Sequence, residues 1–196
     1  MIRKKVIDDS EKDYEKLLED LKFDEERLTA LFKMTQLKGF LEKDYINYTL
    51  KECVRLTRSK VGYLHFVNAD QETLSLYTWS KDVLKHCTAE KVPHYPMKEA
   101  GIWTDCFRER RPIIHNDYPN YPHKKGLPEG HFPLKRHMSV PVFDGDKVVS
   151  IVGIGNKEYP YNDSDTRQLA LFMDKMWRIV KQNRVDELIK ESEQKY

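Results

Sequence analysis

The sequence has no long apolar run and almost no net charge, and both absences exclude classes of protein. No segment approaches the run of about 18 apolar residues that a membrane-spanning helix needs, so we expect no membrane insertion. Basic residues at positions 3–5 are not followed by an apolar stretch, so we expect no secretory signal. A formal net charge of +2 gives no global reason to bind nucleic acid or a membrane surface.

Cysteine is also scarce. The chain has three cysteines, Cys53, Cys87 and Cys106, an odd number without any CxxC pair. We therefore expect free thiols in a reducing cytoplasm rather than a disulfide framework. The CxxCH sequence of c-type haem attachment is absent, and so are the phosphoacceptor and ATP-binding motifs of a histidine kinase. The chain itself is therefore expected to be neither a kinase nor another enzyme.

Charged residues make up 34% of the chain and apolar residues 39%, which is more charge than an ordinary globular domain carries. The excess should lie on long terminal helices that bury one face. Residues 8–37 contain no Gly or Pro, and their apolar side chains follow alternating steps of three and four. A lone helix of this kind needs a partner, so we expect a homodimer seam. Its residues are Leu21, Leu28 and Leu31 near one end and Met176 and Val180 near the other.

The middle of the chain has the two-residue period of strands, with turn residues between the runs. Because most strands follow one another, we expect an α+β fold with a mainly antiparallel central sheet. Helices should cover one face of this sheet, and loops on the other face should enclose a pocket. The expected strands are 61–68, 73–80, 94–97, 112–117, 139–143 and 148–155, and the expected helices are 8–37, 42–58, one over 100–111, and one from about 164 to near the C-terminus.

Three motifs resemble a known family. They are RRPIIHNDY, the stretch KGLPEGHFPLKRHMSVPVFDGDKVVSIVGIGNK, and the set Asn156-Lys157, Tyr161 and Asp165. Together with the order of elements, they resemble the GAF domains of bacterial and archaeal sensor histidine kinases over residues 38–184. The third set is similar to the signature of cyclic-nucleotide-binding GAF domains, but Tyr161 replaces its phenylalanine and Thr166 its glutamate, which argues against a cyclic nucleotide. The motif implies a structural Lys157–Asp165 pair.

The resemblance implies a cytoplasmic sensory module that binds a small molecule or haem. Residues 1–37 would be an N-terminal signalling helix, and residues 185–196 a linker helix toward a following PAS or kinase domain. Ligand binding would alter the packing of the terminal helices in a dimer. Two alternatives stay open. One is an enzyme similar to the GAF family that reduces free methionine sulfoxide with pocket cysteines, and the other is a ligand-free dimerisation spacer.

The stretch from His115 to His131 contains three histidines, three prolines and two glycines. The gaps of seven, seven and five residues between His115, His123, His131 and His137 do not match the short ligand pairs of structural zinc sites. We interpret the stretch as a lid over the pocket, stiffened by its prolines. The residues expected to face a ligand are Tyr77, Trp79, His94, Trp103, His115, Asp117, Tyr118 and His131.

The cofactor is unknown from the sequence, and haem is one candidate. Some GAF domains of archaeal sensor kinases bind haem, and the resemblance extends to their relatives. Cys87 and His131 lie in the two loops expected to cover the pocket. A thiolate and an imidazole can both ligate haem iron, so these two residues are the candidate metal ligands.

Overall fold

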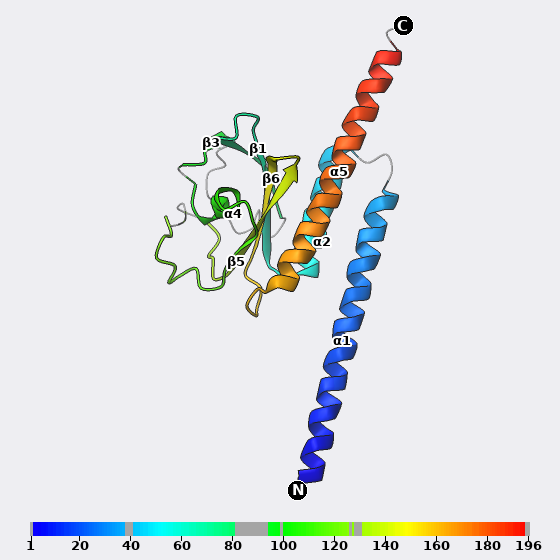
Figure 1. Cartoon of the computed structure of the whole chain (residues 1–196), viewed down its shortest axis with the longest axis vertical. Coiled ribbons are helices and arrows are strands. Elements are labelled where there is room, and N and C mark those ends of the chain that lie inside the picture. The colour runs from blue at the N-terminus through cyan, green and yellow to red at the C-terminus, as the bar shows by residue number, and fades with distance from the viewer. Residues whose placement is uncertain are drawn as a thin grey trace. The chain divides into compact units, whose positions relative to one another are not determined.

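A computed structural model describes residues 2–37, 41–80, 94–98, 100–125, 127 and 131–194 (Figure 1). The chain divides into two units, Met1–Lys38 and Gly39–Tyr196, which are described separately. No helix in these described ranges is both long enough and apolar enough to cross a membrane.

The first unit is one helix, α1 (Ile2–Gln36). Its uninterrupted length follows from the absence of Gly and Pro. Much of the expected apolar stripe is exposed on it, including Tyr14, Leu17, Leu21 and Leu28. An isolated helix has little stability in water, so a helix with an exposed apolar stripe needs packing against a partner.

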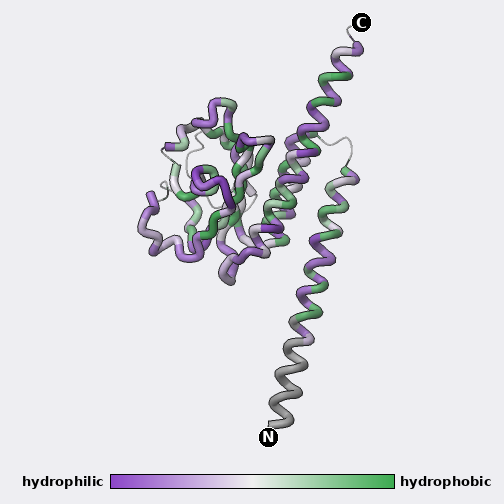
Figure 2. The backbone as a smooth tube through the Cα atoms, viewed as in Figure 1, coloured by the Kyte–Doolittle hydropathy of each residue, from purple (hydrophilic) through white to green (hydrophobic). Residues whose placement is uncertain are grey.

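The second unit contains a six-stranded sheet in which every neighbouring pair is antiparallel. The order across the sheet is β3-β2-β1-β6-β5-β4. Strands β5 and β6 are buried along most of their length, and the sheet carries much of the hydrophobic sequence (Figure 2). The expected antiparallel sheet is confirmed. The strands are β1 (Val61–Val67), β2 (Thr73–Trp79), β3 (His94–Pro96), β4 (Ile113–His115), β5 (His137–Asp144) and β6 (Lys147–Gly155).

Two helices, α2 (Glu42–Leu56) and α5 (Asp163–Glu193), pack on one face of the sheet (Figure 1). The expected arrangement of helices on one face is confirmed. The expected helix over 100–111 is shorter, consisting of η1 (Ile102–Thr104) and α4 (Asp105–Arg108). It ends there because Arg110 has φ of 54°, in the left-handed region that helices cannot continue through.

A buried ion pair fixes the end of β6 to the start of α5. Lys157 Nζ lies 2.7 and 2.8 Å from the carboxylate oxygens of Asp165, which is almost fully buried. Asp165 also accepts a hydrogen bond from the backbone N–H of Asn162, whose side chain caps the helix in return. The pairing implied by the sequence is confirmed. Tyr161, in the phenylalanine position, adds a 2.8 Å hydrogen bond between its hydroxyl and that of Ser59.

The apolar residues of α5 divide into two groups along the helix. Met176 and Val180 are buried, because this part of α5 packs on β5 and α2. The prediction that these two residues form a dimer seam is therefore wrong. The exposed large apolar side chains nearer the C-terminus are Val185, Leu188 and Ile189.

Candidate ligand-binding site

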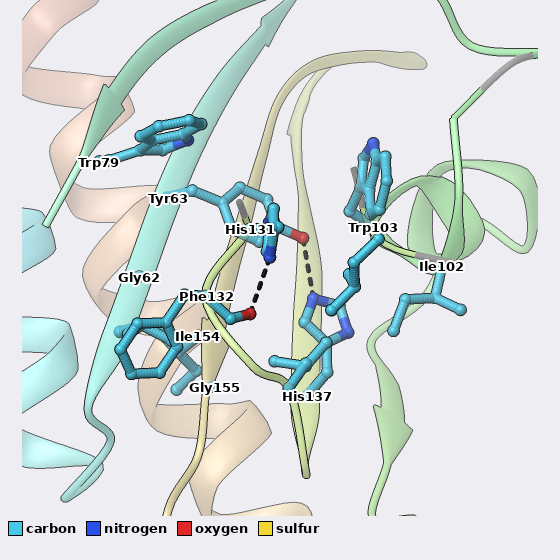
Figure 3. A pocket seen from close by; sticks show the side chains of 13 residues that line it. Gly62, Tyr63, Trp79, Ile102, Trp103, His131, Phe132, His137, Ile154 and Gly155 are labelled. Carbon is cyan, nitrogen blue, oxygen red and sulfur yellow. Dashed lines mark hydrogen bonds between the residues drawn. The ribbon is translucent and has the colours of Figure 1, made fainter. Parts of the chain in front are cut away.

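An aromatic cavity lies on the face of the sheet away from α2 and α5. The strand alternation of β1 directs Val61 and Tyr63 toward it, whereas a Cβ on Gly62 would meet α2 side chains. The cavity volume is about 50 Å³. Figure 3 shows its wall, with Trp79 and Trp103 on opposite sides. The lining residues are Val61, Gly62, Tyr63, Trp79, Ile102, Trp103, Leu127, His131, Phe132, Leu134, His137, Ile154 and Gly155.

The main polar contact of this wall is a tyrosine–histidine pair. The Tyr63 hydroxyl lies 2.8 Å from Nε2 of His137 on β5 (Figure 3), and the two rings are nearly parallel, with an interplanar angle of 5°. Gly153, on the strand between them, makes this possible. A Cβ at that position would overlap the Tyr63 ring, so glycine is required for the ring to lie across β6.

His137 is held neutral in this environment. It is buried, and burial lowers its pKa to about 3, with a smaller contribution from the nearby His115. His115 lies directly opposite on β4, with ring centroids 5.8 Å apart. Its Nε2 is 3.2 Å from Asp105, and burial lowers its pKa although this carboxylate opposes the shift. Burial also lowers the pKa of His65, beside Tyr63, to about 3.

His131 reaches the cavity from the segment that precedes β5. Its Nδ1 lies 2.8 Å from the backbone carbonyl oxygen of Phe132 (Figure 3). Since a carbonyl only accepts, Nδ1 carries the proton, and Nε2 keeps a free lone pair in the neutral ring. Histidines that ligate metals commonly have this second hydrogen bond, which fixes their tautomer and orientation.

Three of the residues predicted to face a ligand line the cavity, namely Trp79, Trp103 and His131. Tyr77 does not, and its placement there was wrong. The register between β1 and β2 shifts at Leu64/His65, which leaves Tyr77 as the extra residue of a bulge. The bulge turns Tyr77 to the helix-covered face, where its ring contacts Phe66 at a centroid distance of 4.9 Å.

The remaining predicted residues lie behind or outside the cavity wall. His115 stands behind His137, and Tyr118 is buried elsewhere. Asp117 is exposed and accepts a hydrogen bond from Asn120, because β4 ends at His115 and the chain then turns outward. Neither Asp117 nor Tyr118 is among the described residues that line the cavity, and their ligand-facing role stays a prediction.

Two predicted residues cannot be placed at the cavity. The backbone of His94 belongs to β3, at the edge of the sheet beyond β2, but its side chain lies outside the described residues. Cys87, the predicted sulfur ligand, also lies outside them. Within the described residues, no three His, Cys, Asp or Glu side chains cluster as a metal site.

The two cysteines that the structure describes offer no reactive thiolate. Cys53 is buried between α2 and α5, with Sγ 4.0 Å from Sδ of Met173, and burial raises the pKa of its thiol strongly. Cys106 is fully buried on the other side of the sheet, and burial raises its pKa to about 12. A thiol with such a pKa stays protonated at neutral pH and is a poor nucleophile.

The prediction missed Tyr63 and His137, of which local sequence could have indicated only Tyr63. Strict alternation in VGYLHFV puts Tyr63 and His65 on one face of the strand, opposite Leu64 and Phe66. The register that brings His137 opposite His115 depends on the pairing of distant strands, for which the sequence carries no local signal.

The fold is shared with solved GAF domains. The GAF domain of an Acinetobacter phosphoenolpyruvate-protein phosphotransferase superposes with a TM-score of 0.65 at 13% identity, over 81% of this chain and 94% of that one. The free methionine-R-sulfoxide reductase of Neisseria meningitidis superposes with a TM-score of 0.63 at 10% identity, over 82% and 91% of the two chains. At these identities the likeness concerns the fold alone.

Sequence comparison gives the family. The model of the GAF domain family matches residues 42–181, and the chain therefore belongs to the GAF family. It is also 43% identical over 166 residues to the methyl sulfide methyltransferase-associated sensor of Methanosarcina acetivorans. That match covers 84% of this chain but only 17% of the relative.

Proposed function

We propose that this GAF domain is the sensory module of a cytoplasmic signal-transduction protein and binds a ligand in the aromatic cavity. The relative of 43% identity is named a sensor, which supports the sensory role. The cavity supports a flat and mainly apolar ligand, since aromatic side chains form much of its wall. In this proposal Trp79 and Trp103 contact the faces of the ligand, and Tyr63 defines the floor.

The observation that carries the ligand proposal is the orientation of His131. Its Nδ1–H donates a hydrogen bond to the carbonyl oxygen of Phe132. This leaves the Nε2 lone pair as the acceptor or metal ligand that the ring can offer at the cavity wall. This donor suits haem, whose iron would supply redox chemistry or gas binding when bound. The volume of about 50 Å³ is well below the roughly 300 Å³ of sites for drug-sized ligands. Haem binding therefore requires the segment of His131 and Phe132 to move outward.

The small cavity also favours a second candidate function. A domain that serves only as a dimerisation spacer needs no room for a ligand, and a volume of about 50 Å³ holds no more than a few water molecules. The two candidates differ in one respect that can be measured, because only the sensory module binds a ligand at this wall.

We further propose that the signal leaves through the terminal helices of a homodimer toward a kinase or PAS domain. The exposed apolar side chains of α1, such as Leu21 and Leu28, support a helix partner there. At the other end, Val185, Leu188 and Ile189 take the place of the buried Met176 and Val180. Light scattering at tens of micromolar tests this arrangement, and a monomer at that concentration contradicts it.

The deciding experiment is a visible spectrum of the purified protein mixed with haemin, first oxidised and then reduced. We expect a sharp Soret band that shifts on reduction and is lost in His131→Ala and Cys87→Ala. The exposed His123 offers a matched control, and His123→Ala should keep the band. A spectrum identical to that of free haemin contradicts haem binding, and native mass spectrometry for a co-purified molecule then separates an organic ligand from the spacer function.

A further cysteine variant tests an enzymatic role. Reduction of free methionine sulfoxide requires a thiolate, and neither Cys53 nor Cys106 supplies one. We expect no turnover with methionine sulfoxide and a thiol reductant. Turnover that disappears in Cys87→Ser would contradict the purely sensory function.

A further inference from the structure

A second hollow lies beside the aromatic cavity and has a different character. It is a groove of about 520 Å³ at the point where β1 begins, β6 ends and the chain enters β5. Phe132 and Pro133 form its apolar side. Its charged residues are Lys60, Lys135, Arg136, Lys157 and Glu158. We propose that this groove binds a small multivalent oxyanion, such as pyrophosphate or the phosphate groups of an organic phosphate.

The groove has a surplus of positive charge. Lys60 and Lys135 are exposed, and in the described part of the chain neither side chain forms an ion pair or a hydrogen bond. Lys157 is compensated by Asp165, at 2.7 Å, so it adds little net charge. Among the described residues of the lining, Glu158 is the one acid, and it offsets a single cation. Two unpaired ammonium groups and a guanidinium therefore share one hollow, which attracts an anion.

The guanidinium of Arg136 has hydrogen-bond donors without a partner among the described residues. One terminal nitrogen donates to the backbone carbonyl of Lys157 at 3.3 Å, which anchors the side chain along the groove. Its Nε is buried without a hydrogen-bond partner among the described residues, so the donors left for an anion are on the terminal nitrogens. The guanidinium is a planar fork that matches two oxygens of a phosphate or carboxylate. A partly bonded arginine beside two free lysines suits an anion with several oxygens.

The backbone holds the cations in place. Asn156, with φ of 61°, accepts from the N–H of Lys135 at 2.7 Å and donates to the carbonyl of Pro133 at 2.7 Å. Its own N–H donates to the carbonyl of Arg136 at 2.9 Å, and the N–H of Lys60 donates to that of Gly155. The three segments that carry the basic residues are thus tied together, so binding an anion orders less backbone.

The inference does not require a ligand in the aromatic cavity, since Phe132 is the one described residue that lines both hollows. Its test is calorimetric titration of the whole chain with inorganic pyrophosphate in a phosphate-free buffer of low salt. We expect saturable binding that weakens about tenfold in the Lys60→Ala/Lys135→Ala variant, if each exposed charge contributes typical surface electrostatics. Glu158→Gln should tighten binding, because it removes a negative charge from the lining.

A matched control removes the same charge elsewhere. Lys51 and Lys147 are exposed and lie outside the groove, so Lys51→Ala/Lys147→Ala should bind pyrophosphate like the parent chain. All of these positions are at the surface, so the variants should fold. Equal weakening in both double variants, or no binding by the parent chain, overturns the proposal. Amide NMR shifts on titration should centre on Lys60, Lys135 and Asn156, and shifts centred elsewhere also overturn it.

Discussion

Acid should unfold this domain at a higher pH than its carboxylates alone would require. His65 and His137 are buried on the sheet, and burial lowers the pKa of each from 6.5 to about 3. In the unfolded chain both imidazoles take up protons below about pH 6.5. The folded domain leaves them neutral down to about pH 3. The two histidines therefore leave the free energy of unfolding unchanged above their unfolded pKa of about 6.5. Between this pH and their folded pKa of about 3, they lower it as the pH falls.

The size of the effect follows from proton linkage. Each proton bound only by the unfolded chain lowers the free energy of unfolding by about 1.4 kcal/mol per pH unit. Two histidines give about 2.7 kcal/mol per pH unit once both are charged in the unfolded state, or roughly 5 kcal/mol between about pH 6.5 and about pH 4.5. That is comparable to the whole stability of many domains.

Urea unfolding, followed by tryptophan fluorescence at a series of pH values, measures the slope of the free energy of unfolding against pH. In His137→Phe the slope should fall by about half, because one buried histidine is removed. The stability of that variant at neutral pH should also fall, since Tyr63 loses its 2.8 Å partner. His123→Gln, at an exposed position, should leave the slope unchanged. A slope that is the same in His137→Phe and the parent chain would refute the reasoning.

Two further predictions concern packing and charge. Gly153→Ala should destabilise the domain by about 1–3 kcal/mol, because its Cβ overlaps the Tyr63 ring and must displace it from His137; an unchanged urea midpoint contradicts this contact. Lys157→Ala should cost about 3–5 kcal/mol, since it leaves the buried Asp165 without its cation. Arg178→Ala removes only an exposed ion pair and should cost less than about 1 kcal/mol. Similar losses in these two variants would contradict the burial argument.

Local sequence patterns predicted the elements of this fold well. The strands were predictable because hydrophobic alternation and turn residues such as Asp144-Gly145-Asp146 act over short distances. The Lys157–Asp165 pair followed from the resemblance to the family. The helix over 100–111 was overestimated, because nothing in its composition reveals the left-handed backbone at Arg110.

The candidate site was harder to predict, since it depends on register. Regular alternation would place Tyr77 and Trp79 on the same face, and only the bulge separates them. The buried cross-strand pair of His115 and His137 joins strands whose pairing no local pattern reveals. The sequence analysis interpreted the stretch 115–131 from its composition, which does not show this pairing. For the terminal helix, periodicity showed which residues are apolar but not whether the sheet or a partner covers Met176 and Val180.

The segment from His131 to Arg136 contributes residues to the linings of both hollows. His131, Phe132 and Leu134 face the aromatic cavity, while Phe132, Pro133, Lys135 and Arg136 face the basic groove. In the two proposals, a ligand that displaces this segment from one side would change the free energy of binding on the other side. Thermodynamic reciprocity then requires both occupants to change each other's affinity by the same factor. If both proposals hold, this stretch of chain would couple the two ligands, and their combination would set the state of the domain.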